Sequence, residues 1–525
     1  MRRTSAHCAW FFALALLASA PAAAADGDTG SGQRISLQEA LFRGLERNFD
    51  LQAERLNISI GSEDVIVAES RFDPVAEALA SAGGEKIPEA VVPFDEAYSR
   101  RRQYAATTAL NKEFHTGLDS RLAMRAVRQS NDAAAIGLDP EYRTFLVLDF
   151  TQPLLRDFGT DVNTADLRIA GQRLQQARFG YLDQAQRLVE AIELAYLELA
   201  RAHEILRLRI ESRNLASELL EGNRNKFEAG IVPITEVQEA ETAVAARDEQ
   251  VVFSRQQLET AAYLLKNLLE IGHDDPLAGE LLIAEALPGI EPDWPQLTTA
   301  MATALAERPD LEQLKLEIIN RDIRLAYYQN QQLPRLDLDA SFGVNGLSGD
   351  LTDGPGSGTR ANSGDYWDSL DQAASGDGYT WFVGLRFEYP LGNRAAEARY
   401  RRAGHEKRRA LYSLKSLENT VETEVRNALS TVERVYERIQ VAERFQRLAD
   451  ITLNQEMERL QEGLTDTFRI LEFQAAVIES RVRKANAQID FHQGIASLYR
   501  AMGANLERHG IVNVQENKEP HNAKN

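Results

Sequence analysis

The chain has 525 residues, of which 59 are basic and 79 acidic, so its net charge is −20, and 44% of the residues are hydrophobic. This composition excludes an intrinsically disordered chain. A charged fraction of 26% and a mean hydropathy of −0.36 exclude a bundle of apolar transmembrane helices. The acidic surplus argues against a nucleic-acid partner, because binding to phosphates requires a basic surface.

Residues 1–25 have the pattern of a secretory signal peptide. Arg2 and Arg3 precede an apolar run over 9–20, and small residues lead to Ala25. An uncleaved membrane anchor is the alternative, but this run is shorter than the roughly 20 residues that span a bilayer. Cys8 is the only cysteine and lies in this segment, so we expect no disulfide, thiolate metal site or cysteine catalysis in the mature chain.

The rest of the sequence indicates an internal duplication. Four pairs of segments match in the same order: 40–51 with 300–311, 151–154 with 388–391, 170–171 with 403–404, and 226–231 with 459–464. We therefore expect a first repeat over 26–271, a Pro-rich linker over 272–295, a second repeat over 296–503 and a polar C-terminal tail over 504–525.

Each repeat begins with a predicted helix. Ser36 and Glu39 have the spacing of a capping box, and the helix is expected to run to about Arg71, ahead of Pro74. The corresponding helix of the second repeat is expected to end before Pro334, because proline disfavours helix in the preceding residue.

After each of these prolines the hydrophobic period changes to two. Alternating runs at 335–345 and 379–389, and at 146–150 in the first repeat, predict strands of about 11 residues, a length that crosses a bilayer when the strand is tilted. A soluble sandwich is the alternative, but the signal peptide and the aromatic strand ends favour a membrane barrel. The lipid-facing side chains are then Leu146, Leu148, Phe150, Leu336, Leu338, Phe342, Trp381, Val383, Leu385 and Phe387.

Two segments between the strands are less clear. Residues 346–378 are rich in Gly and Asp and predict a solvent-exposed loop. The runs 104–114 and 118–127 predict an inserted hairpin. The pattern does not decide whether this hairpin widens the barrel or stands above it.

Two long helical hairpins make up most of the chain. Apolar residues recur at alternating steps of three and four from Leu188 to Leu206 and from Leu417 to Ile439, which is typical of a coiled-coil seam. Each long helix is expected to end at a glycine, Gly230 or Gly463, and a second helix to return from it. About 65 residues of helix make a rod of roughly 100 Å.

A count of strands then predicts an oligomer. Four well-supported strands per chain cannot close a barrel, since small barrels need about eight strands, and open sheet edges are not tolerated in lipid. We therefore expect several copies to share one barrel, with the helical rods forming a tube beneath it.

The signal peptide, the duplicated order of helix, strands and helical hairpin, the TQPL strand end (151–154) and the glycine turns resemble the TolC family of outer membrane efflux proteins. The resemblance covers about residues 35–503. It implies a mixed α and β fold: a trimer whose twelve-stranded β-barrel in the outer membrane of a Gram-negative bacterium continues into an α-helical barrel across the periplasm. It also implies a passive exit duct of a tripartite efflux pump or type I secretion system, without cofactor or catalysis, served by a periplasmic adaptor and an inner-membrane transporter.

The resemblance also assigns residues. The periplasmic tip, where the adaptor would bind, falls on Gly230, Ile231, Thr235, Gly463, Leu464 and Thr465, and the constriction of the entrance on Glu236, Glu239, Arg469 and Glu472. Rings of like charge at the constriction would select ions, and a salt bridge between Glu236 and Arg469 of neighbouring subunits would latch it. The alternative for these residues is a solvated helix end.

The sequence gives little support for a metal site or for a different function. The pair His405 and Glu406 lacks the second histidine of a zinc protease helix, so no metal site is expected. The alternative function is a periplasmic coiled-coil adaptor or scaffold, which should have one hairpin within a single β-domain rather than two hairpins that each follow strands.

Overall fold

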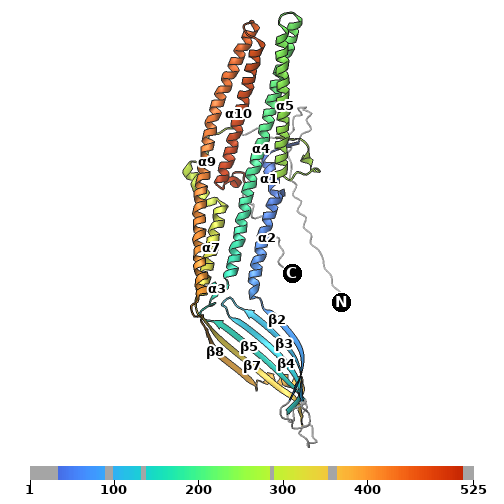
Figure 1. Cartoon of the computed structure of the whole chain (residues 1–525), viewed down its shortest axis with the longest axis vertical. Helices are drawn as coiled ribbons and strands as arrows, with labels where there is room; N and C mark the ends of the chain where they lie inside the picture. The colour runs from blue at the N-terminus through green and yellow to red at the C-terminus, as the bar shows by residue number, and fades with distance from the viewer. Residues whose placement is uncertain (1–32, 89–97, 132–136, 284–288, 353–363, 512–525) are drawn as a thin grey trace, which may run out of the picture.

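The computed structural model describes residues 33–88, 98–131, 137–283, 289–352 and 364–511. The predicted signal peptide lies outside these ranges. Figure 1 shows a long rod of helices that carries one tilted β-sheet at its lower end. In the described part of the chain, no helix is both long enough and apolar enough to traverse a bilayer.

The two halves of the chain share an underlying order of two helices, strands of the large sheet, a long helix and a return helix, but the first half has two more strands and the second has a helix between its strands. The first half comprises β1 (Gln33–Ile35), α1 (Leu37–Arg47), α2 (Phe49–Glu69), the 3-10 turn η1 (Ser70–Phe72), β2 (Val75–Pro88), β3 (Tyr98–Glu113), β4 (Asp119–Asn131), β5 (Gly137–Pro153), α3 (Thr160–Asn163), α4 (Ala165–Glu228) and α5 (Ile234–Leu268). The second comprises η2 (Pro276–Ala278), β6 (Leu281–Ile283), α6 (Leu297–Glu307), α7 (Pro309–Asn330), β7 (Arg335–Thr352), α8 (Tyr366–Ser375), β8 (Tyr379–Glu388), α9 (Arg394–Gln461), α10 (Thr467–Ala501) and α11 (Asn505–Arg508).

The long helices form the rod, as the heptad pattern predicts. Helix α4 has 64 residues and α9 has 68, and the return helices α5 and α10 have 35 each. The predicted seams are buried: Ile192 and Leu199 lie in one hydrophobic core, and Val421 and Val432 in a second. Below the return helices, α2 packs on α4, while α7 packs on both α4 and α9.

The single helix predicted from Ser36 to about Arg71 is wrong, because the chain breaks at Asn48. The side chain of Ser36 does cap α1 by accepting a hydrogen bond from Glu39 N at 3.1 Å. Asn48 adopts a ψ of 123° and accepts from Leu51 N at 3.1 Å, so it starts a second helix. In the second half the break falls between Arg308 and Pro309, where proline occupies the first turn of α7.

All strands of the sheet are antiparallel and follow the order β2-β3-β4-β5-β7-β8. The sheet therefore has six strands per chain, which are the four well-supported strands and the two of the inserted hairpin, whose place the sequence pattern left open. The inserted hairpin at 104–127 corresponds to β3 and β4, which lie between β2 and β5 in continuous register.

The turn of this hairpin is anchored where the sheet meets the rod. Gly159 N donates to Thr116 O at 3.2 Å, and the rings of Phe72 and His115 stack with centroids 4.2 Å apart. Gly117 has a φ of +88°, and a Cβ there would lie 2.6 Å from Asp157 O, so only glycine fits. The hairpin is therefore part of the sheet and does not stand above it.

The solvent-exposed loop predicted over 346–378 is wrong in part. Strand β7 continues to Thr352, and α8 packs on the sheet, where Ser369 Oγ lies 2.5 Å from Thr144 Oγ1. A Cβ on Gly346 would lie 1.8 Å from Ser369 O, which explains the glycine at this contact. Asp365 and Asp368 form a capping box for α8, so part of the aspartate-rich composition starts a helix.

The linker and the start of the tail pack on the middle of the rod. Strand β6, within the predicted linker, pairs in parallel with β1. In the tail, Asn505 Nδ2 donates to Gln186 O at 2.7 Å, and Arg508 and His509 contact the buried carboxylate of Glu193 at 3.2 and 3.1 Å. Residues 504–511 are therefore docked, and the remainder of the predicted tail lies outside the described residues.

Candidate functional site

The tip of the rod carries two turns with the same geometry. Gly230 and Gly463 have φ values of +76° and +72°. After α4, Gly230 N donates to Phe227 O at 2.8 Å and Ile231 N to Lys226 O at 2.9 Å. After α9, the corresponding bonds run from Gly463 and Leu464 to the carbonyls of Leu460 and Arg459, at 3.1 and 2.9 Å. Both are Schellman motifs, which require a left-handed residue after the helix.

Apolar side chains are exposed at both turns. Ile231 is 71% exposed, Leu464 62% and Phe468 62%. Single exposed apolar residues are ordinary on protein surfaces, but several at the end of a rod form a contact surface. The assignment of Gly230, Ile231, Thr235, Gly463, Leu464 and Thr465 to adaptor contact stays a prediction.

One predicted constriction residue joins the two hairpins at the tip. Glu236 Oε2, on α5, accepts a hydrogen bond from Thr467 N at the start of α10, at 3.1 Å. The carboxylate thus lies at a helix N-terminus, where negative charge is favourable. Asn223 completes the contact: its Nδ2 donates to Thr467 Oγ1 at 2.8 Å and to Glu236 O at 3.2 Å. The sequence did not single out Asn223, although a buried amide in a coiled-coil helix is a signal of a specific contact.

Arg469 has its partner within its own hairpin. Its Nε lies 3.3 Å from Glu456 Oε1 on α9, and the Glu456 side chain is only 6% exposed. Arg459 also pairs with Glu456, at 3.2 Å, and Thr465 Oγ1 donates to it at 2.6 Å. The predicted latch between Glu236 and Arg469 of neighbouring subunits stays a prediction, but in one chain both side chains already have other partners.

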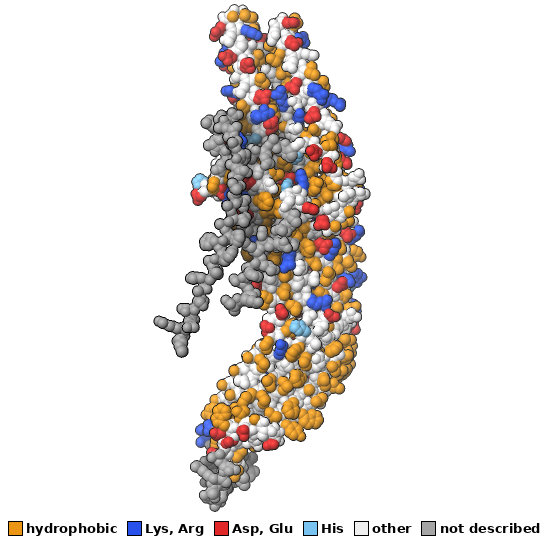
Figure 2. Space-filling model, turned by 180° about the vertical axis from the view of Figure 1, so that it is seen from behind, with side chains coloured by type: hydrophobic (Ala, Val, Ile, Leu, Met, Phe, Trp, Pro, Cys, Tyr) orange, Lys and Arg blue, Asp and Glu red, His pale blue; other side chains and the backbone are white. Residues whose placement is uncertain are grey.

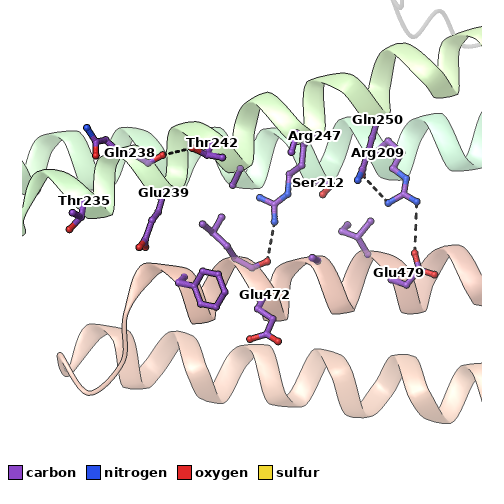
Figure 3. A pocket seen from close by; sticks show the side chains of 16 residues that line it. Arg209, Ser212, Thr235, Gln238, Glu239, Thr242, Arg247, Gln250, Glu472 and Glu479 are labelled. Carbon is purple, nitrogen blue, oxygen red and sulfur yellow. Dashed lines mark hydrogen bonds and ion pairs between the residues drawn. The ribbon is translucent and has the colours of Figure 1, made fainter.

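The other two constriction residues, Glu239 and Glu472, line a groove of about 900 Å³ between α5 and α10. Figure 3 shows Glu239 extending from α5 toward α10, with Glu472 on α10 in the same view. Farther from the tip, Arg247 donates from Nη2 to Leu471 O at 3.1 Å and is almost fully buried. Burial lowers the pKa of the Arg247 guanidinium from its usual value. The groove is thus lined by the two predicted carboxylates and by the buried guanidinium of Arg247, which the sequence analysis did not identify.

The predicted lipid-facing residues share one face of the sheet. Directly opposite residues of antiparallel strands point to the same side, and the register places Leu148 opposite Phe342 and Phe342 opposite Trp381. By the same register, all of the predicted lipid-facing residues point to this side of the sheet: Leu146, Leu148, Phe150, Leu336, Leu338, Phe342, Trp381, Val383, Leu385 and Phe387. Figure 2 shows hydrophobic side chains covering much of this end of the molecule. Lipid contact itself stays a prediction.

The opposite face of the sheet is polar. It carries Glu77, Gln103, Arg121, Arg125, Asp149, Asp339 and Arg386, with Arg386 paired to Asp339 at 2.9 Å. The sheet therefore has one face suited to hydrocarbon and one suited to water.

Comparison with known proteins gives a family match over part of the chain and a fold. Residues 300–504 match the family described as outer membrane efflux protein. No curated protein matches the chain. The outer-membrane channel OprN has a similar fold: it is 18% identical, with a TM-score of 0.60, and the match covers 89% of this chain and 90% of OprN. The CmeC outer membrane channel of Campylobacter jejuni is 17% identical, with a TM-score of 0.62 and coverage of 89% of this chain and 86% of CmeC. The outer membrane protein VceC of Vibrio cholerae is 16% identical, with a TM-score of 0.62 and coverage of 89% of this chain and 96% of VceC.

These matches confirm the resemblance that the sequence indicates. The family description names the outer membrane, which agrees with the expected location. At these identities the solved channels establish the fold. Both the family and the similar structures are channel proteins rather than enzymes.

Proposed function

We propose that this chain, whose residues 300–504 match the outer membrane efflux protein family, is one third of a passive duct. The duct would carry substrates across the periplasm and the outer membrane. The single observation that carries the proposal is a sheet with one apolar and one polar face, continuous with paired helical rods.

The sheet supports assembly of several copies. Its outermost strands, β2 and β8, each have one hydrogen-bonding edge without a partner strand among the described residues. Lipid cannot hydrogen-bond such an edge, so membrane strands occur in closed barrels. Pairing β8 of one chain with β2 of the next closes the wall without any new element.

The number of strands is larger than the resemblance implies. With six strands per chain, three copies give eighteen strands, in place of the twelve of the TolC family. Barrels of 16 to 18 strands leave an aqueous channel, whereas about eight strands leave room only for side chains. The polar face of the sheet would line this channel.

The two helical hairpins support a tube collinear with the barrel. Matching helix lengths and identical tip turns favour an internal duplication, so three chains would supply six similar hairpins. At 1.5 Å per residue each long helix extends about 100 Å. The exposed apolar tips fit a periplasmic adaptor that joins the duct to an inner-membrane transporter, in a tripartite pump or a type I secretion system.

A periplasmic adaptor or scaffold is the competing function. Such a protein has no reason to expose a continuous apolar sheet face in which Trp381 and Leu385 are 69% and 68% exposed. Contiguous apolar patches of this kind mark membrane or protein contacts. The sheet therefore favours the duct.

Reconstitution tests the proposal. Protein extracted from outer membranes with detergent should run as a trimer and give stable single-channel currents in planar bilayers. Material that stays soluble without detergent and gives no currents would support the scaffold instead.

The constriction is tested in the same bilayers. Three copies of Glu472 would form a ring of negative charge that favours cations, so Glu472→Gln should move the reversal potential in a salt gradient toward zero. Glu479→Gln is the matched control, because Glu479 lines the same groove but pairs with Arg209 and Arg483 at 3.8 and 3.2 Å. If the reversal potential shifted equally in both variants, Glu472 would not belong to the constriction.

A further inference from the structure

A group of basic residues lies on the apolar face of the sheet, at the end far from the rod. We call Lys86, Arg100, Arg102 and Arg128 the rim cluster. Arg128 shares its face with Met124, which is opposite Leu146, one of the predicted lipid-facing residues. The register extends this face to the neighbouring strands, since Arg128 is opposite Tyr104 in β3.

The remaining members of the cluster follow from the same register. Lys86 is directly opposite Arg100, and Gly84, which has no side chain, is opposite Arg102. Arg102 is opposite Ser130, two residues along β4 from Arg128. All four side chains are exposed. They therefore form one patch across three adjacent strands.

This arrangement is unfavourable without an anion. Like charges directly opposite each other on a sheet destabilise it, yet Lys86 faces Arg100, with Arg102 two residues away on the same side. In the described ranges, no carboxylate forms an ion pair with any member of the rim cluster. The patch thus has positive charge that the sheet itself does not neutralise.

Several acidic side chains among the described residues of this region have other partners. Glu85 pairs with Arg101 at 3.0 Å, and Arg101 has the parity of the polar face. Glu141 pairs with Arg143, also on the polar face. On α8, Asp365 accepts from Trp367 N, and Asp368 from Asp365 N, both at 2.8 Å. These acids serve the opposite face or a helix cap.

Aromatic rings and a groove lie next to the cluster. Lys86 Nζ lies 4.4 Å from the centre of the Tyr98 ring, and the Arg128 guanidinium 5.9 Å from that of Tyr142. A groove of about 550 Å³ begins at Arg128, and most of its wall consists of alanine and tyrosine: Ala80, Ala82, Tyr104, Ala105, Ala106, Ala126, Tyr142 and Tyr366. Small side chains leave space on this face for a hydrocarbon chain.

We propose that the rim cluster and this groove bind a phosphorylated lipid of the outer leaflet. Arginine binds phosphate through several hydrogen bonds at once, and lysine supplies a compact charge. The phosphates would contact the rim cluster while an acyl chain occupies the groove. This inference rests on the proposed function, because the duct orientation puts this end of the sheet at the outer surface.

The first experiment uses the wild-type trimer in detergent with bis-phosphorylated lipid A as the probe. Native mass spectrometry should show retained lipid, and removal of both phosphates from the lipid should weaken binding at least tenfold. Equal retention of the two lipids would overturn the proposal, because it would show that the acyl chains alone bind.

The second experiment compares two triple variants of the same strands. Arg100→Gln, Arg102→Gln and Arg128→Gln together should weaken lipid A binding at least tenfold. Arg101→Gln, Arg121→Gln and Arg125→Gln together remove the same charge from the polar face and should leave binding unchanged. Equal binding by both variants would overturn the site, whereas single-channel currents, measured in parallel, report separately on the proposed duct.

Discussion

The rod and the sheet place their apolar side chains in opposite ways. In the rod, Ile192 and Leu199 are fully buried in the seam between helices, although other apolar side chains of the rod, such as Val441, are exposed in the single chain. In the sheet, Trp381 and Leu385 are more than two-thirds exposed, while Asp337 on the other face is 1% exposed. The buried seams of the rod are those of helices packed in water, and the exposed apolar face of the sheet is the face that the proposed duct would turn toward lipid.

This difference shows that one rule operates in two environments. Apolar surface leaves water wherever it can, by packing on another helix in the rod and by facing hydrocarbon in the sheet. A sheet from one chain cannot satisfy the rule alone because its edges stay open. The contrast between the two regions therefore argues for assembly of several chains. It can be tested by removing a buried charge from the rod and by adding a charge to each face of the sheet.

The largest effect is expected for a buried charge in the rod. Arg308 is 5% exposed and pairs with Asp310 at 2.7 Å and with Glu424. Burial opposes its charge, but hydrogen bonds to both carboxylates outweigh this and raise its pKa. Arg308→Met should lower the free energy of unfolding by about 3–5 kcal/mol, because it leaves the carboxylates without their partner.

Thermal or denaturant unfolding in detergent measures this loss. The control is Arg434→Met, which removes an exposed pair with Glu437 on the same helix, 2.8 Å apart, and should cost at most about 1 kcal/mol. Equal losses would show that the interior of the rod tolerates a lone carboxylate.

The next effect tests the two faces of the sheet. Val383 and Phe382 are adjacent in β8 and similarly exposed in one chain, at 62% and 57%, but they point to opposite faces. Val383→Arg should destabilise the membrane-inserted protein by about 2–4 kcal/mol, because it puts a charge in lipid. Phe382→Arg should cost far less, since the barrel interior is wet.

Unfolding from lipid vesicles by denaturant measures both variants. If the two substitutions cost the same, the faces do not differ in solvent and the barrel account fails.

A smaller effect is expected at the tip turns. Gly463 has a φ of +72°, so Gly463→Ala should destabilise by about 1–2 kcal/mol, the usual penalty for a side chain in the left-handed region. Gly404→Ala, inside the N-terminal part of α9 with open space around its Cβ, should instead stabilise by up to about 1 kcal/mol. Thermal midpoints of both variants check this pair, and destabilisation by both would show that Gly404 has a packing role.

The smallest effect concerns a carboxylate in the rod. Burial raises the pKa of Glu190, although its Oε1 accepts a hydrogen bond from Ser497 Oγ at 2.9 Å. The folded state thus holds the proton more tightly than the unfolded state, and charged Glu190 costs stability at pH 7. Glu190→Gln should raise the thermal midpoint slightly at pH 7.

The gain should shrink as the pH falls toward 4.5, the ordinary value for glutamate, because Glu190 then takes up its proton. Glu221→Gln, at an exposed position of the same helix, is the control. A gain that does not depend on pH would assign the effect to something other than titration.

Much of the fold could be predicted because it is periodic. The steps of three and four between apolar residues predicted the long helices of the rod, and Gly230 and Gly463 predicted the turns at its tip. The face of the sheet followed from alternation, since a strand turns each side chain by half a revolution. The number of strands did not follow, because weakly alternating runs such as β3 give no sign of the strands they pair with.

The site was less predictable than the fold. Glu236 could be selected by its place after the glycine turn, but its partner, Thr467, is 231 residues away in sequence. Arg247 gave no local signal, because its importance comes from packing between hairpins, and the amide of Asn223 is a signal only once its place in the helix seam is known. Contacts of this kind are set by tertiary structure and cannot be derived from spacing.

In the proposed duct, three copies close one eighteen-stranded wall around a polar channel. The most direct measurement is electron cryomicroscopy of the purified protein in lipid nanodiscs, with the strands counted in cross-section. We expect three-fold symmetry, eighteen strands and β8 of each chain hydrogen-bonded to β2 of its neighbour. A twelve-stranded barrel with β3 and β4 outside the wall, or a particle without a closed barrel, would contradict it.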